Sequence, residues 1–291
     1  MSAPVAAASG RYLAEAAAAG LLHRVRGLRY VAGMHHDPLL DERRFLVEYG
    51  DEELLADPVW RAGLVEQALG EDPQAVSVVV RAPASVLFGG PWQRELSYLY
   101  HPADDAGVPA AGPDDGPGPC VATAGPDEEE AVADWLVQAM VRGSADLGAA
   151  ADPEVAGQLA RECLAAPGRH SYVARLDGRP VGHATLLCRA EDEVTGRRAV
   201  ELVDMLIDLP DGPRREAAAA LTAAALAHAR RLELPLLGHV VHPSPGADGS
   251  DHGARVVASL VGRGWEADHV FWRCPTGSAA DSPSRFTKDA A

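Results

Sequence analysis

Two carboxylates in one apolar segment are the strongest chemical signal in this sequence. Glu201 and Asp204 lie in the run Val200–Ile207 (VELVDMLI), and every other residue of that run is apolar. A carboxylate among apolar side chains has a raised pKa, which suits a general base that takes a proton at neutral pH. Because side chains alternate between the faces of a strand, we expect the two acids to point to opposite faces, with one facing a cleft. The alternative for Glu201 is an edge carboxylate that pairs with Arg197 or Arg198.

Three histidines offer further groups for proton transfer. His183 lies in an expected hairpin, and His239 and His242 lie in a later strand. Imidazole titrates near neutral pH and can act as a base or relay, although a single histidine at a strand end more often serves packing. The sequence has no nucleophile elbow, zincin motif, Walker loop or dinucleotide-binding glycine motif. Hydrolase, metalloprotease, NTPase and Rossmann functions therefore have no positive support.

Residues 120–275 contain the elements that must position these groups. A helix follows Pro126, because its first turn is acidic and Val132, Leu136 and Met140 recur at helical spacing. An Asp177-Gly178 turn between two apolar runs predicts a hairpin. Together the elements predict a mixed α/β sheet flanked by helices. The other expected elements are a helix at Pro153–Leu164, hairpin strands at Ser171–Arg175 and Gly182–Cys188, a strand at Ala199–Leu209, a helix at Arg215–Leu232, a strand at Pro235–His242, a helix at Gly253–Arg263 and a strand at Glu266–Arg273.

The first 102 residues predict a smaller α/β domain. Residues 103–119 (ADDAGVPAAGPDDGPGP) have no apolar period and predict a linker between the domains, and residues 276–291 predict a flexible tail. The domain boundaries expected from the sequence are thus 1–102 and 120–275. Its expected elements are helices at Arg11–Leu22 and Pro58–Leu69, and strands at Phe45–Tyr49, Val76–Arg81 and Leu96–His101.

One segment of the N-terminal part aligns with the end of the chain. Gly89–Pro102 (GGPWQRELSYLYHP) matches Gly262–Pro275 (GRGWEADHVFWRCP) without gaps, and a β-branched run precedes each. Both combine glycine, tryptophan, charged residues, an aromatic strand and proline. This favours a shortened repeat of the C-terminal domain, and chance similarity between two aromatic strands is the alternative.

Composition narrows the classes of partner. A net charge of −16, with no run of Lys or Arg, makes nucleic acid a poor general partner and suits a cationic amine. No apolar run reaches the roughly 20 residues that a membrane helix needs, and the start lacks the features of a signal peptide, so we expect a cytoplasmic protein. Four cysteines without a C-x-x-C pair predict neither a metal site nor a disulfide framework.

The order of elements over residues 120–275 resembles the GNAT superfamily of N-acetyltransferases, and GRGWEADHVFWR resembles the closing strand of that family. With the repeat, the chain looks like a tandem-GNAT protein with a degenerate N-terminal half. The resemblance implies acyl transfer from acetyl-CoA or another acyl-CoA to a small-molecule amine, and the Ala-, Gly-, Arg- and Pro-rich composition suggests bacterial secondary metabolism. VELV is similar to the strand that carries the base in one branch of the family, so Glu201 is the expected base, ahead of Asp204.

The resemblance also implies where the cofactor would bind. The backbone at Met205–Ile207 (Met205, Leu206 and Ile207) would separate from its neighbour strand and leave an N–H for the thioester oxygen. The family's pyrophosphate loop, R/Q-x-x-G-x-G/A, corresponds to Gly212–Ala217, which lacks the inner glycines. Arg214 and Arg215 would then bind the phosphates directly, and Ala217 would let the backbone approach.

Two further positions bear on catalysis and on the alternatives. His242 stands where the family often has an asparagine that faces the cofactor, and Leu260 stands where it often has the tyrosine that protonates the thiolate. Loss of that tyrosine and of the glycines leaves two other functions open. One is acyl transfer from an aminoacyl-tRNA, and the other is a non-enzymatic GNAT-like binding protein.

Overall fold

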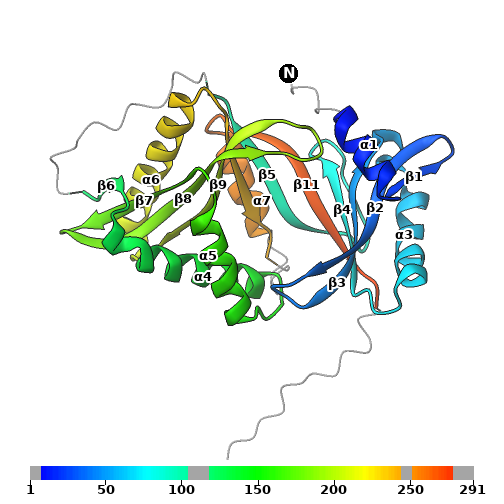
Figure 1. The fold of residues 1–291 in the computed structure, drawn as a ribbon, viewed down its shortest axis with the longest axis horizontal. Coiled ribbons are helices and arrows are strands. Elements are labelled where there is room, and N and C mark those ends of the chain that lie inside the picture. The colour runs from blue at the N-terminus through cyan, green and yellow to red at the C-terminus, as the bar shows by residue number, and fades with distance from the viewer. Residues whose placement is uncertain (1–7, 104–117, 244–250, 278–291) are drawn as a thin grey trace, which may run out of the picture.

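The computed structural model describes residues 8–103, 118–243 and 251–277, and one mixed sheet of eleven strands runs through both halves of the chain (Figure 1). Its strand order is β1-β2-β3-β4-β11-β5-β10-β9-β8-β7-β6. The predicted mixed α/β class is therefore confirmed, while most of the expected linker and tail lies outside the described residues. The strands are β1 Leu22–Val25, β2 Leu28–Asp37, β3 Glu42–Gly50, β4 Ser77–Pro83, β5 Gln93–His101, β6 Cys120–Thr123, β7 Arg169–Leu176, β8 Arg179–Glu191, β9 Arg198–Ile207, β10 Leu236–Val241 and β11 Glu266–Pro275.

Helices cover the back face of the sheet along most of its length and the front face only towards its ends. The back face packs on α2 and α3 in the N-terminal half and on α6 in the C-terminal half, each through a cluster of buried apolar side chains. The front face packs on α4 and α5 in the C-terminal half and on α1 in the N-terminal half. No helix in the described part of the chain is long and apolar enough to cross a membrane. The helices are α1 Gly10–Ala18, α2 Glu52–Ala56, α3 Pro58–Glu71, the 3₁₀ turn η1 Pro126–Glu128, α4 Glu129–Asp146, α5 Pro153–Ala165, α6 Asp211–Arg231 and α7 His252–Val261.

The aligned strands β5 and β11 are antiparallel neighbours at the centre of the sheet. Ser97 and Val270, which the alignment of the repeat equates, are also opposite each other in the ladder. On its other side β5 pairs with β10, and β11 pairs with β4, so each half places its last strand against the other half. The parallel pair β3–β4 then corresponds to the parallel pair β9–β10. The sheet is thus built from two halves of related topology.

Two hairpins cross from one half to the other on the front face (Figure 1). The β8–β9 connection reaches the N-terminal half, where Val194 O accepts a hydrogen bond of 2.8 Å from Ser9 N and Asp192 lies 2.6 Å from Arg81. The β2–β3 connection reaches the C-terminal half, where Leu39 O accepts a hydrogen bond of 3.0 Å from Asp152 N. The front of the central strands is therefore enclosed by elements of both halves.

The N-terminal part departs from the sequence prediction in two regions, of which one is the short helix α2, Glu52–Ala56, that was not predicted. The helix expected at Arg11–Leu22 ends at Ala18, because the chain turns at Gly20 with φ of 75°. The strands β1 and β2 were not predicted. Their connection is Arg26-Gly27 with φ of 52° and 85°, so a non-glycine residue occupies the left-handed region without the usual Asn-Gly or Asp-Gly signal.

Candidate active site

The parallel strands β9 and β10 separate near the middle of the front face. They pair only at Val200 with Leu236 and at Glu201 with Leu237. Beyond these positions β9 continues to Ile207 beside β8, while β10 continues to Val241 beside β5. We call this opening the C-terminal fork. It leaves the edge of β9 without a ladder partner over the segment where the sequence predicted a free backbone.

A β-bulge in β9 places Glu201 and Asp204 on the same face of the sheet. Glu201 is opposite Leu187 of β8, and Asp204 is opposite Thr185. Leu187 and Thr185 are two residues apart and share a face, whereas the two acids are three residues apart, so β9 holds one extra residue near Val203. The expectation that the acids point to opposite faces is wrong, because it assumed unbroken alternation. Both carboxylates face the front.

Glu201 has fewer polar contacts than Asp204. Its side chain is half-buried, and burial raises its pKa. Among the described residues it has no hydrogen-bond or ion-pair partner. Arg197 does not pair with it, since the Arg197 guanidinium lies 3.6 Å from the centre of the Tyr100 ring and 3.5 Å from Asp268. Glu201 therefore has the environment of a proton acceptor.

Asp204 is held by a buried chain of polar groups. His183, which is fully buried, places Nε2 3.1 Å from Asp204 Oδ2 and Nδ1 3.0 Å from Thr185 Oγ1. A carboxylate only accepts hydrogen bonds, so the His183 proton lies on Nε2 and is donated to Asp204. The His183 ring also stacks on Trp135 of α4, with centroids 5.6 Å apart. His183 thus orients Asp204 and has no direct access to the fork.

His239 and Tyr98 border the fork from β10 and β5. Their ring centroids are 5.6 Å apart, and His239 is exposed to solvent. Although this side chain reaches solvent, the protein atoms packed around its ring desolvate it and lower the pKa of His239, and the charge of Asp204 partly offsets this effect. Burial and then the charge of Glu201 raise the pKa of Tyr98 to about 12. Both acids therefore act electrostatically on groups across the opening.

His242 lies on the other side of the sheet. It is buried, with Nε2 2.8 Å from Ser97 Oγ and Nδ1 3.2 Å from Asp251 Oδ1. Gly253 of α7 packs so closely that a Cβ there would come within 2.5 Å of the His242 ring. The structure places this side chain between β5 and α7, and it does not bring His242 together with Glu201 and Asp204. Its contacts are those of a packing residue.

The start of α6 carries the predicted arginines. Arg214 and Arg215 are exposed, and no described residue forms an ion pair with either of them. The helix begins after Pro210, which provides no side-chain cap, so its first N–H groups are available to a ligand. Ala217 is fully buried in the core and does not contribute to this surface, contrary to the expected open approach. Met205 and Ile207 also pack on the back-face cluster, while Leu206 packs under α4.

A groove between α6 and α7 continues from this helix start. It has a volume of about 460 Å³, and its walls include Arg215, Arg263, Thr222 and Leu260. The small side chains of Ala218, Ala219 and Ala223 form its floor. Two guanidinium groups beside a shallow apolar floor suit a ligand that combines phosphate with a flat ring.

The N-terminal half contains a second opening with a different lining. Strands β3 and β4 pair as far as Val47 and Val80 and then diverge; we call this the N-terminal fork. A cavity of about 240 Å³ lies there, closed over by Thr195 and its neighbours from the β8–β9 hairpin. Its carboxylates are Glu48, Asp51, Glu52 and Asp268, with Arg81 beside them. The sequence reasoning missed this cavity, although the repeat implied a counterpart of the C-terminal fork.

The described residues contain no group of three or more His, Cys, Asp or Glu side chains placed to hold a metal ion. No family pattern matches the sequence, and no curated protein resembles it. Similar solved structures include a GNAT-family acetyltransferase from Colwellia psychrerythraea, 11% identical over 87% of this chain and 84% of that chain, with a TM-score of 0.47.

A tandem GNAT protein from the clavulanic acid biosynthesis pathway is 17% identical, with 88% of this chain and 82% of that chain covered and a TM-score of 0.43. A functionally unknown conserved protein from Staphylococcus epidermidis is 10% identical, with 81% and 85% covered and a TM-score of 0.45. All three similarities have TM-scores below 0.5 and concern only the path of the backbone. The chemistry has to be argued from the residues of this chain.

Proposed function

We propose that this protein is an acyl-CoA-dependent N-acyltransferase that acts on a small amine at the C-terminal fork. The observation that carries the proposal is the fork itself: a gap between parallel strands, with two carboxylates on its front side and an arginine-lined groove beyond it on the back. The front side suits an amine that must lose a proton. The back side suits an anionic carrier.

The residues present fit coenzyme A. Arg214, Arg215 and Arg263 supply cations for its phosphates, and the uncapped start of α6 supplies N–H groups. The alanine floor between α6 and α7 has room for the ring of the nucleotide. When bound, acyl-CoA would supply a thioester, whose carbonyl carbon is open to attack by an amine.

The front-face residues would prepare the amine. Glu201 has no partner among the described residues and has a raised pKa, which makes it the preferred acceptor of a proton from an ammonium group. Asp204, held by His183, would keep the negative potential that attracts the cation. The free edge of β9 from Leu202 onward offers backbone groups to a polarised carbonyl oxygen.

The test is product formation. Purified protein is incubated with acetyl-CoA and a panel of primary amines and diamines, and amide products are detected by mass spectrometry. We expect an acetylated amine with the wild-type protein and a strongly reduced yield with Glu201→Gln. If coenzyme A binds but no amine gives a product, the protein is a GNAT-like binding protein and the proposal is wrong. If product forms only with a charged tRNA, the acyl donor is the aminoacyl-tRNA and not acyl-CoA.

A further inference from the structure

A second cavity lies on the front face between the β2–β3 hairpin and the central strands. Its volume is about 170 Å³, and its walls include Asp37, Arg44, Glu95, Tyr98 and Phe271. Two aromatic rings and several aliphatic side chains form one side, and charged groups form the other. The sequence analysis did not find it, because its walls come from β2, β3, β4, β5 and β11.

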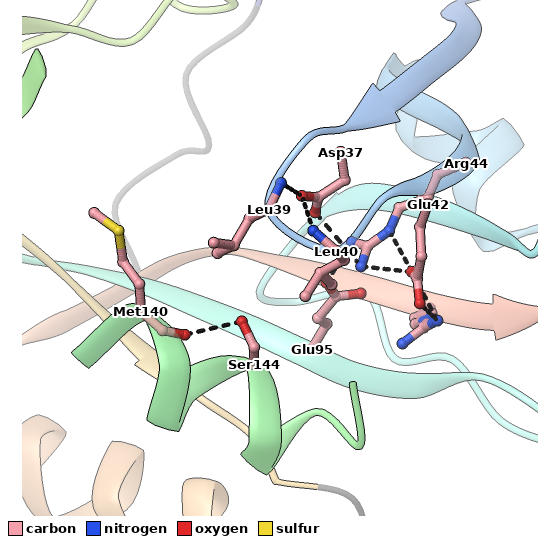
Figure 2. A network of polar contacts seen from close by, with 9 residues as sticks. Asp37, Leu39, Leu40, Glu42, Arg44, Glu95, Met140 and Ser144 are labelled. Carbon is pink, nitrogen blue, oxygen red and sulfur yellow. Dashed lines mark hydrogen bonds and ion pairs between the residues drawn. The ribbon is translucent and has the colours of Figure 1, made fainter. Parts of the chain in front are cut away.

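The charged side of this cavity is organised around Arg44 (Figure 2). Arg44 Nη1 donates a hydrogen bond of 2.8 Å to Glu95 Oε1. Its Nη2 lies 2.9 Å from Glu42 Oε2 and 3.6 Å from Asp37 Oδ2. Asp37 in turn accepts hydrogen bonds from the backbone N–H groups of Leu39 and Leu40, which fixes the hairpin tip.

Glu95 lines the cavity and has one carboxylate oxygen without a hydrogen-bond partner among the described residues. The residue is only 5% exposed, and its Oε2 is buried without a hydrogen-bond partner among the described residues. A buried carboxylate oxygen without a donor is costly, because it has given up its hydrogen bonds to water. Arg44 Nη2 and Arg273 Nε also lack a hydrogen-bond acceptor among the described residues, but both guanidinium groups form an ion pair with Glu42. Glu95 Oε2 is the carboxylate oxygen of this cluster that has no donor among the described residues.

The balance of charge points to a cationic donor. Three carboxylates surround Arg44, and the second guanidinium is that of Arg273, whose Nη2 lies 3.1 Å from Glu42 Oε2. Three carboxylates against two guanidinium groups leave one negative charge in excess, and His35 in the same wall is charged only when protonated. A cation beside Tyr98 and Phe271 would also gain from the faces of the rings.

Tyr98 connects this cavity to the C-terminal fork. Its ring lines the cavity and contacts His239, and the charge of Glu201 acts on its hydroxyl. We propose that the cavity binds a second cationic group of the amine substrate, distal to the amine that is acylated, with Glu95 as its partner. The substrate class is then a diamine or another doubly cationic amine. This inference rests on the proposed acyltransferase function for the assignment of the second amine.

The experiment compares cadaverine with pentylamine, which has the same carbon chain but only one ammonium group. Binding to the full-length protein is measured by calorimetry without any acyl donor. The wild-type protein is expected to bind cadaverine at least about tenfold more tightly, because a charge-assisted hydrogen bond to a buried carboxylate is made only by the diamine. Glu95→Gln is expected to weaken cadaverine binding about 10- to 100-fold and to leave pentylamine unchanged.

A second variant and a control keep the test independent of folding. Leu46→Trp fills the cavity without removing a charge and should also abolish the preference for cadaverine. Glu48→Gln removes a carboxylate from the N-terminal fork and should leave both affinities unchanged. Equal affinity for the two amines, no binding of cadaverine, or full binding by Glu95→Gln would each overturn the proposal. Coenzyme A binding is measured on the same samples, and it tests separately whether the protein binds the proposed acyl donor.

Discussion

The two forks of the sheet have the same topology, but the helix starts that follow them carry different charges. In each, a parallel pair of strands separates and a helix begins after the first strand. The C-terminal fork is followed by Asp211, Arg214 and Arg215 at the start of α6, and no described acid forms an ion pair with either arginine. The N-terminal fork is followed by Asp51, Glu52 and Glu53 at the start of α2. The first helix start therefore offers two guanidinium groups to an anion, whereas the second offers only carboxylates.

The two forks also differ at the position of the proposed general base, Glu201. Leu237 lies opposite Tyr100 and Val79 lies opposite Arg273, and the repeat alignment equates Tyr100 with Arg273. Leu46, the other neighbour of Val79, is therefore the counterpart of Glu201, the other neighbour of Leu237. The N-terminal fork therefore lacks a carboxylate where the C-terminal fork has its unpaired one. The comparison teaches that the topology provides the opening, whereas the side chains at the strand and at the following helix start decide which opening can bind a donor and accept a proton.

The largest expected effect comes from the base. Glu201→Gln should lower turnover by about 10²- to 10⁴-fold with coenzyme A binding preserved, because loss of a general base has this cost. Glu48→Gln, the same chemical change at a carboxylate that lines the N-terminal fork, should leave turnover unchanged. Steady-state kinetics on both variants provide the measurement. An active Glu201→Gln with an inactive Asp204→Asn would move the base to Asp204, on the same face.

The pH profile sharpens this assignment. Glu201 must be deprotonated to act, and its pKa is raised by burial, so kcat/KM of the wild type should fall as the pH drops through that raised pKa. The deficit of Glu201→Gln should shrink at high pH, where the free amine needs no base. A constant deficit across the pH range would show that Glu201 only supports the fold.

The next effect concerns the donor. Changing Arg214 and Arg215 together to Ala should weaken coenzyme A binding by about 2 to 4 kcal/mol, since each charge-assisted contact to a phosphate is worth about 1.5 to 3 kcal/mol and exposed contacts lie at the low end. Changing Glu52 and Glu53 to Ala is the control in the other half and should have no effect. Calorimetric titration separates the two. Unchanged affinity in the arginine variant would contradict the assigned phosphate site.

A smaller effect tests whether contact with β8 constrains the path of β9 at the C-terminal fork. A Cβ at Gly182 of β8 would lie 2.6 Å from Leu206 O and 2.9 Å from Ile207 Cα of β9. Gly182→Ala should therefore lower the free energy of unfolding by about 1 to 3 kcal/mol. Gly212→Ala, where a Cβ meets no atom within 4 Å, is the matched control and should be near neutral. Urea denaturation measures both, and equal stabilities would mean that β8 does not constrain β9.

The smallest effect is on stability as a function of pH. Burial raises the pKa of Glu201 in the folded state, so its cost to stability is absent at low pH and grows as the pH rises through that pKa. Glu201→Gln should thus melt at a higher temperature than the wild type at neutral pH and at the same temperature below about pH 4. A variant that is less stable at neutral pH would show that the carboxylate has a partner.

Local signals predicted most of the C-terminal half and failed where the contacts are not local. The Asp177-Gly178 turn and the alanine-rich α6 are fixed by neighbours in sequence, and both formed as predicted. The bulge near Val203 has no such signal, so the shared face of the two acids could not be predicted. Arg44 and Glu95 meet through strands that are distant in sequence, and only the crossing hairpin brings them together. The gap-free repeat alignment equated Ser97 with Val270, but it did not predict that the two strands pair with each other, as the structure shows.

The central claim is that one fork binds the acyl donor and the other does not. Calorimetric titration of the full-length protein with coenzyme A tests it most directly, with the Arg214/Arg215 double variant beside the wild type. The account predicts one site per chain, weakened in the variant by the amount given above and unaffected by Glu52→Ala or Glu53→Ala. Two equivalent sites, no binding, or one site that depends on the N-terminal carboxylates would contradict it.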